Sequence, residues 1–167
     1  VESTGGMVPA AGLASSAAYF AALSLAVTDL WGLDGDEEAV SDRARRGSVS
    51  AARSVPGGYV ALDPQEAVDG RLPARTVYPA DHWDLAVVVA VVQMGPKDVK
   101  SSDGMKRSRE TSPYYPEWVR ASRDHMSEAL EAMKTRDLER LARVAEFVLE
   151  DVARLGALRP HQIHMQR

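Results

Sequence analysis

The stretch Pro9-Ala10-Ala11-Gly12-Leu13-Ala14-Ser15-Ser16-Ala17-Ala18 is a small-residue loop with two adjacent hydroxyls that leads into an apolar segment. Small residues let a ligand approach the backbone, and the free N–H groups at a helix start attract an anion. The stretch therefore predicts a phosphate cradle for a nucleotide or a diphosphate. An alanine-rich buried helix that begins with two serines would need no ligand, and the stretch alone leaves both interpretations open.

The segment that follows is predicted to be a helix that ends near Trp31, with Gly32 as its stop. Small or apolar residues recur there at steps of three and four, which is the spacing of one helix face. These residues are Leu13, Ala17, Phe20, Ala21, Ser24 and Val27.

Downstream, residues 36–46 predict a charged helix closed by Gly47, and residues 48–54 predict a short second helical turn. Residues 59–62 and 75–78 are predicted strands, separated by a polar connection that is either a hairpin loop or an excursion.

The valine-rich run at residues 85–92 predicts a buried strand. The polar segment at residues 95–113 has no period, so we expect a long loop that covers a ligand. Two amphipathic helices, at residues 117–134 and 137–155, are predicted to form an antiparallel pair.

Composition excludes several classes of protein. The 167 residues are 45% hydrophobic and 26% charged, which is typical of one globular domain or two small ones. The absence of cysteine excludes disulfides and thiolate chemistry, and it fits a cytoplasmic protein. A net charge of -4 without a concentrated basic face argues against nucleic acid as a partner. No apolar run reaches the length of a membrane span, so we expect no membrane partner.

Two further motifs follow the loop, GSVSAARS at residues 47–54 and KDVKSSDGM at residues 97–105, with Thr111-Ser112-Pro113 downstream. The loop resembles the phosphate loop of the GHMP kinase superfamily. The three motifs in this order resemble the diphosphomevalonate decarboxylase family within it, over roughly residues 7–155. The family's Ile-Lys-Tyr-Trp-Gly-Lys and Asp-Ala-Gly-Pro strings do not occur here, so the chain is expected to match a central portion, incomplete at both ends.

The resemblance implies an α+β fold. Residues 1–84 would form part of a ribosomal S5 domain 2-like domain, and residues 85–167 part of a ferredoxin-like domain. It also implies ATP-dependent decarboxylation of mevalonate 5-diphosphate to isopentenyl diphosphate in isoprenoid biosynthesis. ATP and Mg²⁺ would be the cofactors, mevalonate diphosphate the small-molecule partner, and the protein a homodimer.

The resemblance also implies site residues, and the catalytic one is Arg53, which would bind the substrate carboxylate. A guanidinium can hold a carboxylate with two parallel hydrogen bonds. The residues for the ATP phosphates would be Gly12, Leu13, Ala14, Ser15 and Ser16, and those for the substrate Ser50, Arg53, Ser101 and Met105. The metal ligands and the catalytic base stay unassigned.

Alternatives remain for the residues and for the function. Arg53 could instead pair with a surface carboxylate or close its short helix. A basic cluster could attract phosphate or belong to a solvated loop, and its members are Lys97, Lys100, Lys106 and Arg107. Val49 stands where the family usually has glycine, and a branched side chain there could narrow the pocket. The function could be a phosphomevalonate decarboxylase, a mevalonate kinase, or a non-catalytic remnant that binds nucleotide or a partner.

Overall fold

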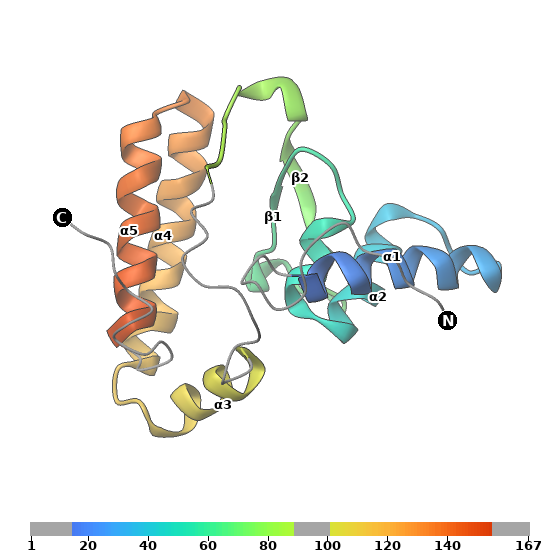
Figure 1. The fold of residues 1–167 in the computed structure, drawn as a ribbon, viewed down its shortest axis with the longest axis horizontal. Helices are drawn as coiled ribbons and strands as arrows, with labels where there is room; N and C mark the ends of the chain where they lie inside the picture. Colours follow the sequence, from blue (N-terminus) through green and yellow to red (C-terminus); the bar gives the residue numbers. More distant parts are fainter. Residues whose placement is uncertain (1–14, 89–100, 155–167) are drawn as a thin grey trace. The chain divides into compact units, whose positions relative to one another are not determined.

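The computed structural model describes residues 15–88 and 101–154, which fall into two compact units, residues 1–97 and 98–167. Figure 1 labels the helices and strands of both units. The predicted cradle residues Gly12, Leu13 and Ala14 lie outside the described part of the chain. The domain boundary between residues 84 and 85 stays a prediction.

The first helix, α1 (Ser15–Leu30), confirms the predicted helix within the described residues. It buries Ala17, Ala21, Ser24 and Thr28 on one face. Thr28 Oγ1 donates a hydrogen bond to the carbonyl oxygen of Ser24 at 2.7 Å, which explains how a hydroxyl is tolerated in the buried face. The chain turns away at Gly32, which has a φ of 57°.

The two predicted helical elements that follow are confirmed as α2 (Glu37–Gly47) and the 3₁₀ helix η1 (Val49–Ser54). Both pack against α1. Their contact is built from small side chains, because Ala44, Ala51 and Ala52 are at most 1% exposed. Small residues let the backbones of the three elements approach closely. The core of this unit is therefore narrow, and a larger side chain has little room there.

The predicted strands form an antiparallel hairpin of β1 (Tyr59–Ala61) and β2 (Arg75–Tyr78). Tyr59 lies opposite Tyr78, and Ala61 lies opposite Arg75. Short 3₁₀ helices lie in the connection, η2 (Pro64–Glu66), and after the hairpin, η3 (Ala80–His82).

The prediction of a buried strand at residues 85–92 is wrong for its described part. Residues 85–88 are irregular, and Val87 and Val88 are 86% and 94% exposed. A valine-rich run becomes a strand only when another strand pairs with it. Among the described residues, β1 and β2 form the only sheet, and β2 ends at Tyr78. Residues 89–92 lie outside the description.

The long loop predicted at residues 95–113 is also wrong for its described part, because α3 (Ser101–Thr111) is an 11-residue helix. Its sequence includes the good helix formers Met105, Lys106, Arg107 and Arg109. Their high helix propensity outweighs the low propensity of Gly104 and the serines. The segment has too few apolar residues to show a helical period in the sequence. The helix ends ahead of Pro113.

The two predicted C-terminal helices are confirmed as α4 (Tyr115–Thr135) and α5 (Leu138–Arg154), which lie side by side in Figure 1. Arg136 makes the sharp turn between them with a φ of 55°. Their antiparallel register follows from two contacts. Arg140 pairs with Glu128, with an Nε–Oε1 distance of 2.5 Å, and Phe147 stacks on His125 further from the turn.

Candidate functional site

The start of α1 provides the described part of the predicted phosphate cradle. Ser15 is half-buried and Ser16 is exposed, and the first turn contains no acidic residue. The first N–H groups of a helix lack intrahelical partners, and the aligned peptide dipoles give this end a partial positive charge. Two hydroxyls and these N–H groups can therefore receive phosphate oxygens without a competing carboxylate in the turn.

The helix η1 carries the predicted substrate residues Ser50 and Arg53. Ala51 and Ala52, between them, are fully buried at 0% exposure and anchor η1 in the first unit. Ser50 is half-buried, and its Oγ lies 3.1 Å from Ser48 Oγ. The side chain of Val49 is 65% exposed.

The guanidinium of Arg53 lacks a carboxylate partner within the described part of the chain. Arg53 is exposed, and it forms no ion pair and no side-chain hydrogen bond with any described residue. The alternative in which Arg53 pairs with a surface carboxylate is therefore not realised among these residues. Its guanidinium has five N–H donors, which can take an anionic ligand.

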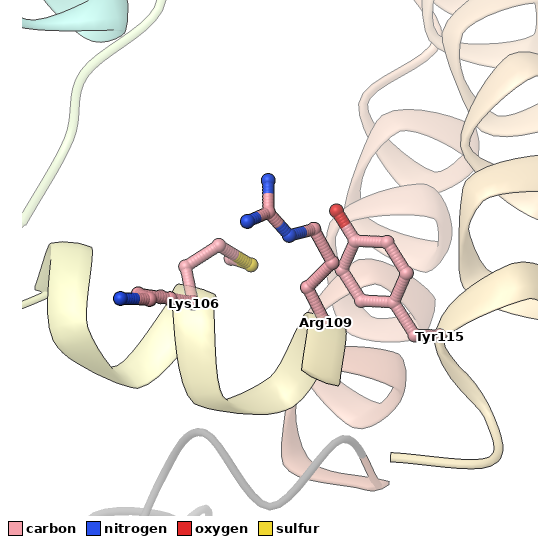
Figure 2. Close-up of a pocket in the computed structure, with 4 residues that line it drawn as sticks. Lys106, Arg109 and Tyr115 are labelled. Carbon is pink, nitrogen blue, oxygen red and sulfur yellow. The ribbon is translucent and has the colours of Figure 1, made fainter. Parts of the chain in front are cut away.

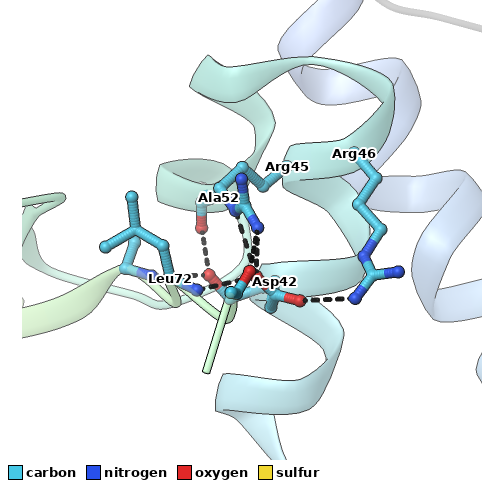
Figure 3. Close-up of polar contacts among 8 residues, drawn as sticks. Asp42, Arg45, Arg46, Ala52 and Leu72 are labelled. Carbon is cyan, nitrogen blue, oxygen red and sulfur yellow. Dashed lines mark hydrogen bonds and ion pairs between the residues drawn. The ribbon is translucent and has the colours of Figure 1, made fainter. Parts of the chain in front are cut away.

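A polar network fixes η1 to α2 and to the segment that enters β2 (Figure 3). Ser41, which is 0% exposed, donates from Oγ to the Ala52 carbonyl oxygen at 3.0 Å. The same Oγ accepts from the Ala74 N–H at 2.8 Å. One buried hydroxyl therefore connects three segments and holds the backbone beside Arg53 in place.

Asp42 extends this network with its carboxylate, as Figure 3 shows. It accepts hydrogen bonds from the Leu72 N–H at 2.8 Å, from Arg45 Nη2 at 2.8 Å and from Arg46 Nη2 at 3.3 Å. Burial opposes ionisation of the Asp42 carboxyl, but the hydrogen bonds from Leu72, Arg45 and Arg46 outweigh it. Together they hold the pKa of Asp42 below its ordinary value.

The second unit holds the other two predicted substrate residues, both on α3. Ser101 is the first residue of the helix. Met105 is 36% exposed and lines an open pocket of about 340 Å³ together with Lys106, Arg109 and Tyr115 (Figure 2). The structure therefore groups Ser15, Ser16, Ser50 and Arg53 in one unit and Ser101 and Met105 in the other.

Sequence reasoning missed four residues of these two regions. Ser41 and Asp42 look like ordinary polar residues of a charged helix, and only their place next to the buried Val40 signals burial. Arg109 follows Lys106 by three positions, but this spacing matters only once the segment is known to be helical. Tyr115 follows the Thr111-Ser112-Pro113 segment by two residues, and no pattern in the sequence marked it as a binding residue.

The expected cofactors fit the described residues unequally. The start of α1 offers hydroxyl and N–H donors suited to ATP phosphates. Among the described residues, no group of three or more histidine, aspartate or glutamate side chains could hold a metal ion, so no magnesium ligands are assigned. Within the same part of the chain, no helix combines the length and apolar character needed to cross a membrane.

Two family models match consecutive parts of the chain. Residues 1–71 match the Diphosphomevalonate decarboxylase-like N-terminal domain. Residues 87–159 match the Mevalonate 5-diphosphate decarboxylase C-terminal domain.

Curated relatives carry the same name. The diphosphomevalonate decarboxylase of Eremothecium gossypii is 42% identical over 139 residues, which are 81% of this chain and 35% of the relative. The human diphosphomevalonate decarboxylase is 44% identical over 115 residues, which are 68% of this chain and 28% of the relative. The chain thus spans about a third of the length of these enzymes.

Solved structures agree with the sequence matches. The structure of MDDEF in complex with MVAPP, AMPPCP and magnesium has a TM-score of 0.73 and 35% identity, covering 90% of this chain and 46% of that one. The mevalonate diphosphate decarboxylase from Staphylococcus aureus has a TM-score of 0.72 and 30% identity, covering 90% of this chain and 45% of that one. The expected α+β, GHMP kinase-like fold is confirmed. This chain belongs to the diphosphomevalonate decarboxylase family.

Proposed function

We propose that this chain binds mevalonate 5-diphosphate and ATP and takes part in the ATP-dependent decarboxylation that yields isopentenyl diphosphate. The tertiary hydroxyl of the substrate is first phosphorylated. Phosphate then leaves with the electrons of its C–O bond, while the electrons of the bond to the carboxyl carbon form the alkene and CO₂ departs. The observation that carries this proposal is the exposed guanidinium of Arg53, which has no partner among the described residues.

Arg53 binds the substrate carboxylate in this proposal. Two parallel hydrogen bonds from a guanidinium fix the plane of a carboxylate, and this orientation sets the direction in which CO₂ leaves. The fully buried Ala51 and Ala52 and the Ser41 hydrogen bond hold the backbone of η1, so Arg53 projects from a fixed base. Ser50 supplies a hydroxyl from the same short helix.

The start of α1 receives the ATP phosphates through Ser15, Ser16 and the first N–H groups of the helix. The first turn has no carboxylate that would repel them. Gly12, Leu13 and Ala14 complete the cradle, and Ser101 and Met105 contact the substrate, as the family resemblance implies. Magnesium, when bound with the nucleotide, neutralises phosphate charge.

The remaining expectations are proposals of the same standing. The protein acts in the cytoplasm as a homodimer, and its domain boundary in the sequence lies between residues 84 and 85. Mevalonate diphosphate is its partner, and neither a nucleic acid nor a membrane is.

The test is an assay of the full chain with Mg-ATP and three substrates: mevalonate diphosphate, mevalonate monophosphate and mevalonate. Equal amounts of CO₂ and phosphate released from the diphosphate, and only with ATP, are expected. ATP consumption with no CO₂ would identify a kinase, and preference for the monophosphate would identify a phosphomevalonate decarboxylase. Absence of turnover on all three substrates would contradict the proposed activity. It would favour the alternative of a non-catalytic remnant that binds nucleotide or a partner.

A pair of matched variants ties turnover to the site. Arg53→Ala removes the guanidinium proposed to bind the substrate carboxylate, and it should abolish most of the CO₂ release. Arg71→Ala removes another exposed arginine of the same unit and should leave CO₂ release unchanged. Equal losses in the two variants would contradict the proposed role of Arg53.

A further inference from the structure

The pocket of about 340 Å³ in the second unit has a lining suited to an anion. Lys106 and Arg109 contribute two positive charges, Tyr115 contributes a phenol, and no carboxylate lines it. Figure 2 shows the guanidinium of Arg109 and the phenol oxygen of Tyr115 on the same side, while the ammonium of Lys106 points away from both. The volume falls at the lower end of small-molecule pockets, roughly 300–1,000 Å³.

The cations of this pocket are not neutralised by described neighbours. Neither Lys106 nor Arg109 forms an ion pair or a side-chain hydrogen bond with any residue that the structure describes, although Asp103 and Glu110 lie on the same helix. Other cations of this unit do pair, as Arg140 does with Glu128 and Arg143 with Glu139. The donors of Arg109 are therefore available to a ligand.

Packing holds the two donor groups in place. Ser108, next to Arg109, is 3% exposed, so this turn of α3 is anchored. The ring of Tyr115 lies against Trp118, with ring centroids 5.5 Å apart and an angle of 46° between the planes. A guanidinium on an anchored turn and a phenol on a packed ring lose less conformational entropy on binding than two free side chains would.

We propose that Arg109 and Tyr115 bind a phosphoryl group in this pocket, and that Lys106 adds positive charge beside it. Two guanidinium N–H groups match two phosphoryl oxygens, and the phenol O–H donates to a third. A carboxylate has only two oxygens and one charge, so it uses this donor set less fully. The pocket is thus a phosphoryl site beside Met105, formed by residues of the second unit.

Two ligands could bring such a group: the diphosphate of the substrate and the polyphosphate of ATP. Naming these two rests on the proposed function. The binding of a phosphoryl anion by the pocket does not, because it follows from the charges and donors of α3 and α4.

The experiment titrates inorganic diphosphate into the full chain and follows the indole N–H signal of Trp118 by NMR, since Trp118 packs on Tyr115. Arg109→Gln should weaken binding about tenfold, and Tyr115→Phe should weaken it by a smaller factor. The control Arg123→Gln removes an exposed arginine of α4 that also has no ion pair among the described residues, and it should leave the affinity unchanged. Circular dichroism checks that each variant is folded.

Mevalonate diphosphate and AMPPCP are then titrated into the same variants. The ligand whose affinity falls in Arg109→Gln is the source of the phosphoryl group. Mevalonate, whose only anionic group is a carboxylate, should bind the parent and Arg109→Gln with equal affinity. Absence of saturable diphosphate binding, an affinity in Arg109→Gln within about twofold of the parent, or an equal loss in Arg123→Gln would overturn the proposal. Diphosphate binding that survives in a chain without decarboxylation would sustain it while the proposed function fails.

Discussion

Gly47 at the end of α2 lies against the ring of Phe20 on α1, so that a Cβ built on Gly47 would stand 2.3 Å from Phe20 Cδ1 and 2.7 Å from Cγ. Both distances are far below van der Waals contact. Gly47 has no positive φ, so its requirement for glycine comes from space and not from backbone conformation. This close approach sets how near α1 lies to α2, and therefore the position of the serines at the start of α1 in their unit.

Gly47→Ala should lower the free energy of unfolding by roughly 1–3 kcal/mol, because the added methyl displaces the Phe20 ring or separates the two helices. Urea unfolding followed by circular dichroism measures the change. Gly57→Ala is the matched control, since a Cβ there has no neighbour within 4 Å. If both variants unfold at the same urea concentration, Gly47 does not lie in close contact with the Phe20 ring.

Ser41→Ala should lower the free energy of unfolding by roughly 1–3 kcal/mol, because it leaves the Ala74 N–H and the Ala52 carbonyl oxygen without their buried partner. Hydrogen exchange should locate the damage, with faster exchange at the Ala74 amide. Ser127→Ala, which removes an exposed hydroxyl from α4, should change stability by less than about 0.5 kcal/mol. Unchanged protection of the Ala74 amide in Ser41→Ala would refute the bridging role.

Asp42 should make the first unit sensitive to acid. Its pKa in the folded state is below the ordinary value of 3.8, so the ionised form stabilises the fold above that pH. This stabilisation is lost as pH falls below 3.8 through the folded-state pKa. The free energy of unfolding, measured with urea from pH 7 downward, should fall below about pH 4, and it should fall less in Asp42→Asn. The control Asp84→Asn, which changes an exposed carboxylate, should lose as much stability below about pH 4 as the parent does. The same dependence of stability on pH in Asp42→Asn as in the parent would contradict the role of Asp42.

Gly58 should tolerate alanine less well than Gly70 does. Both have a positive φ, 79° and 75°, so an alanine at either position is destabilised by the left-handed backbone conformation. Only at Gly58 would the Cβ also meet backbone, 2.5 Å from the Tyr78 carbonyl oxygen. Comparing the urea midpoints of the two variants isolates this contact. A Gly58→Ala protein as stable as the Gly70→Ala protein would argue against the described end of the hairpin.

Local patterns predicted most helices of this chain correctly. Apolar spacing located α1, and the charged run closed by Gly47 located α2. These features act over a few residues, so the sequence displays them directly. The helix α3 was missed because its polar residues show no apolar period, although their helix propensity is high.

Features that depend on distant residues were harder to predict. Val87 and Val88 have high strand propensity, yet they are 86% and 94% exposed and irregular because no described strand pairs with them. The spacing of residues 47–54 and the family resemblance singled out Ser50 and Arg53. Neither could show that Ser41 supports their helix through contacts 11 and 33 residues away in sequence.

The proposed role of Arg53 is tested most directly by comparing two ligands that differ in the substrate carboxylate. Isothermal titration of the full chain measures the affinity for mevalonate diphosphate and for isopentenyl diphosphate, which has no carboxylate. Arg53→Ala should weaken mevalonate diphosphate binding about tenfold or more and leave isopentenyl diphosphate binding nearly unchanged, while Arg71→Ala should affect neither. Equal losses for the two ligands in Arg53→Ala, or no loss for either, would contradict the assignment of Arg53 to the carboxylate.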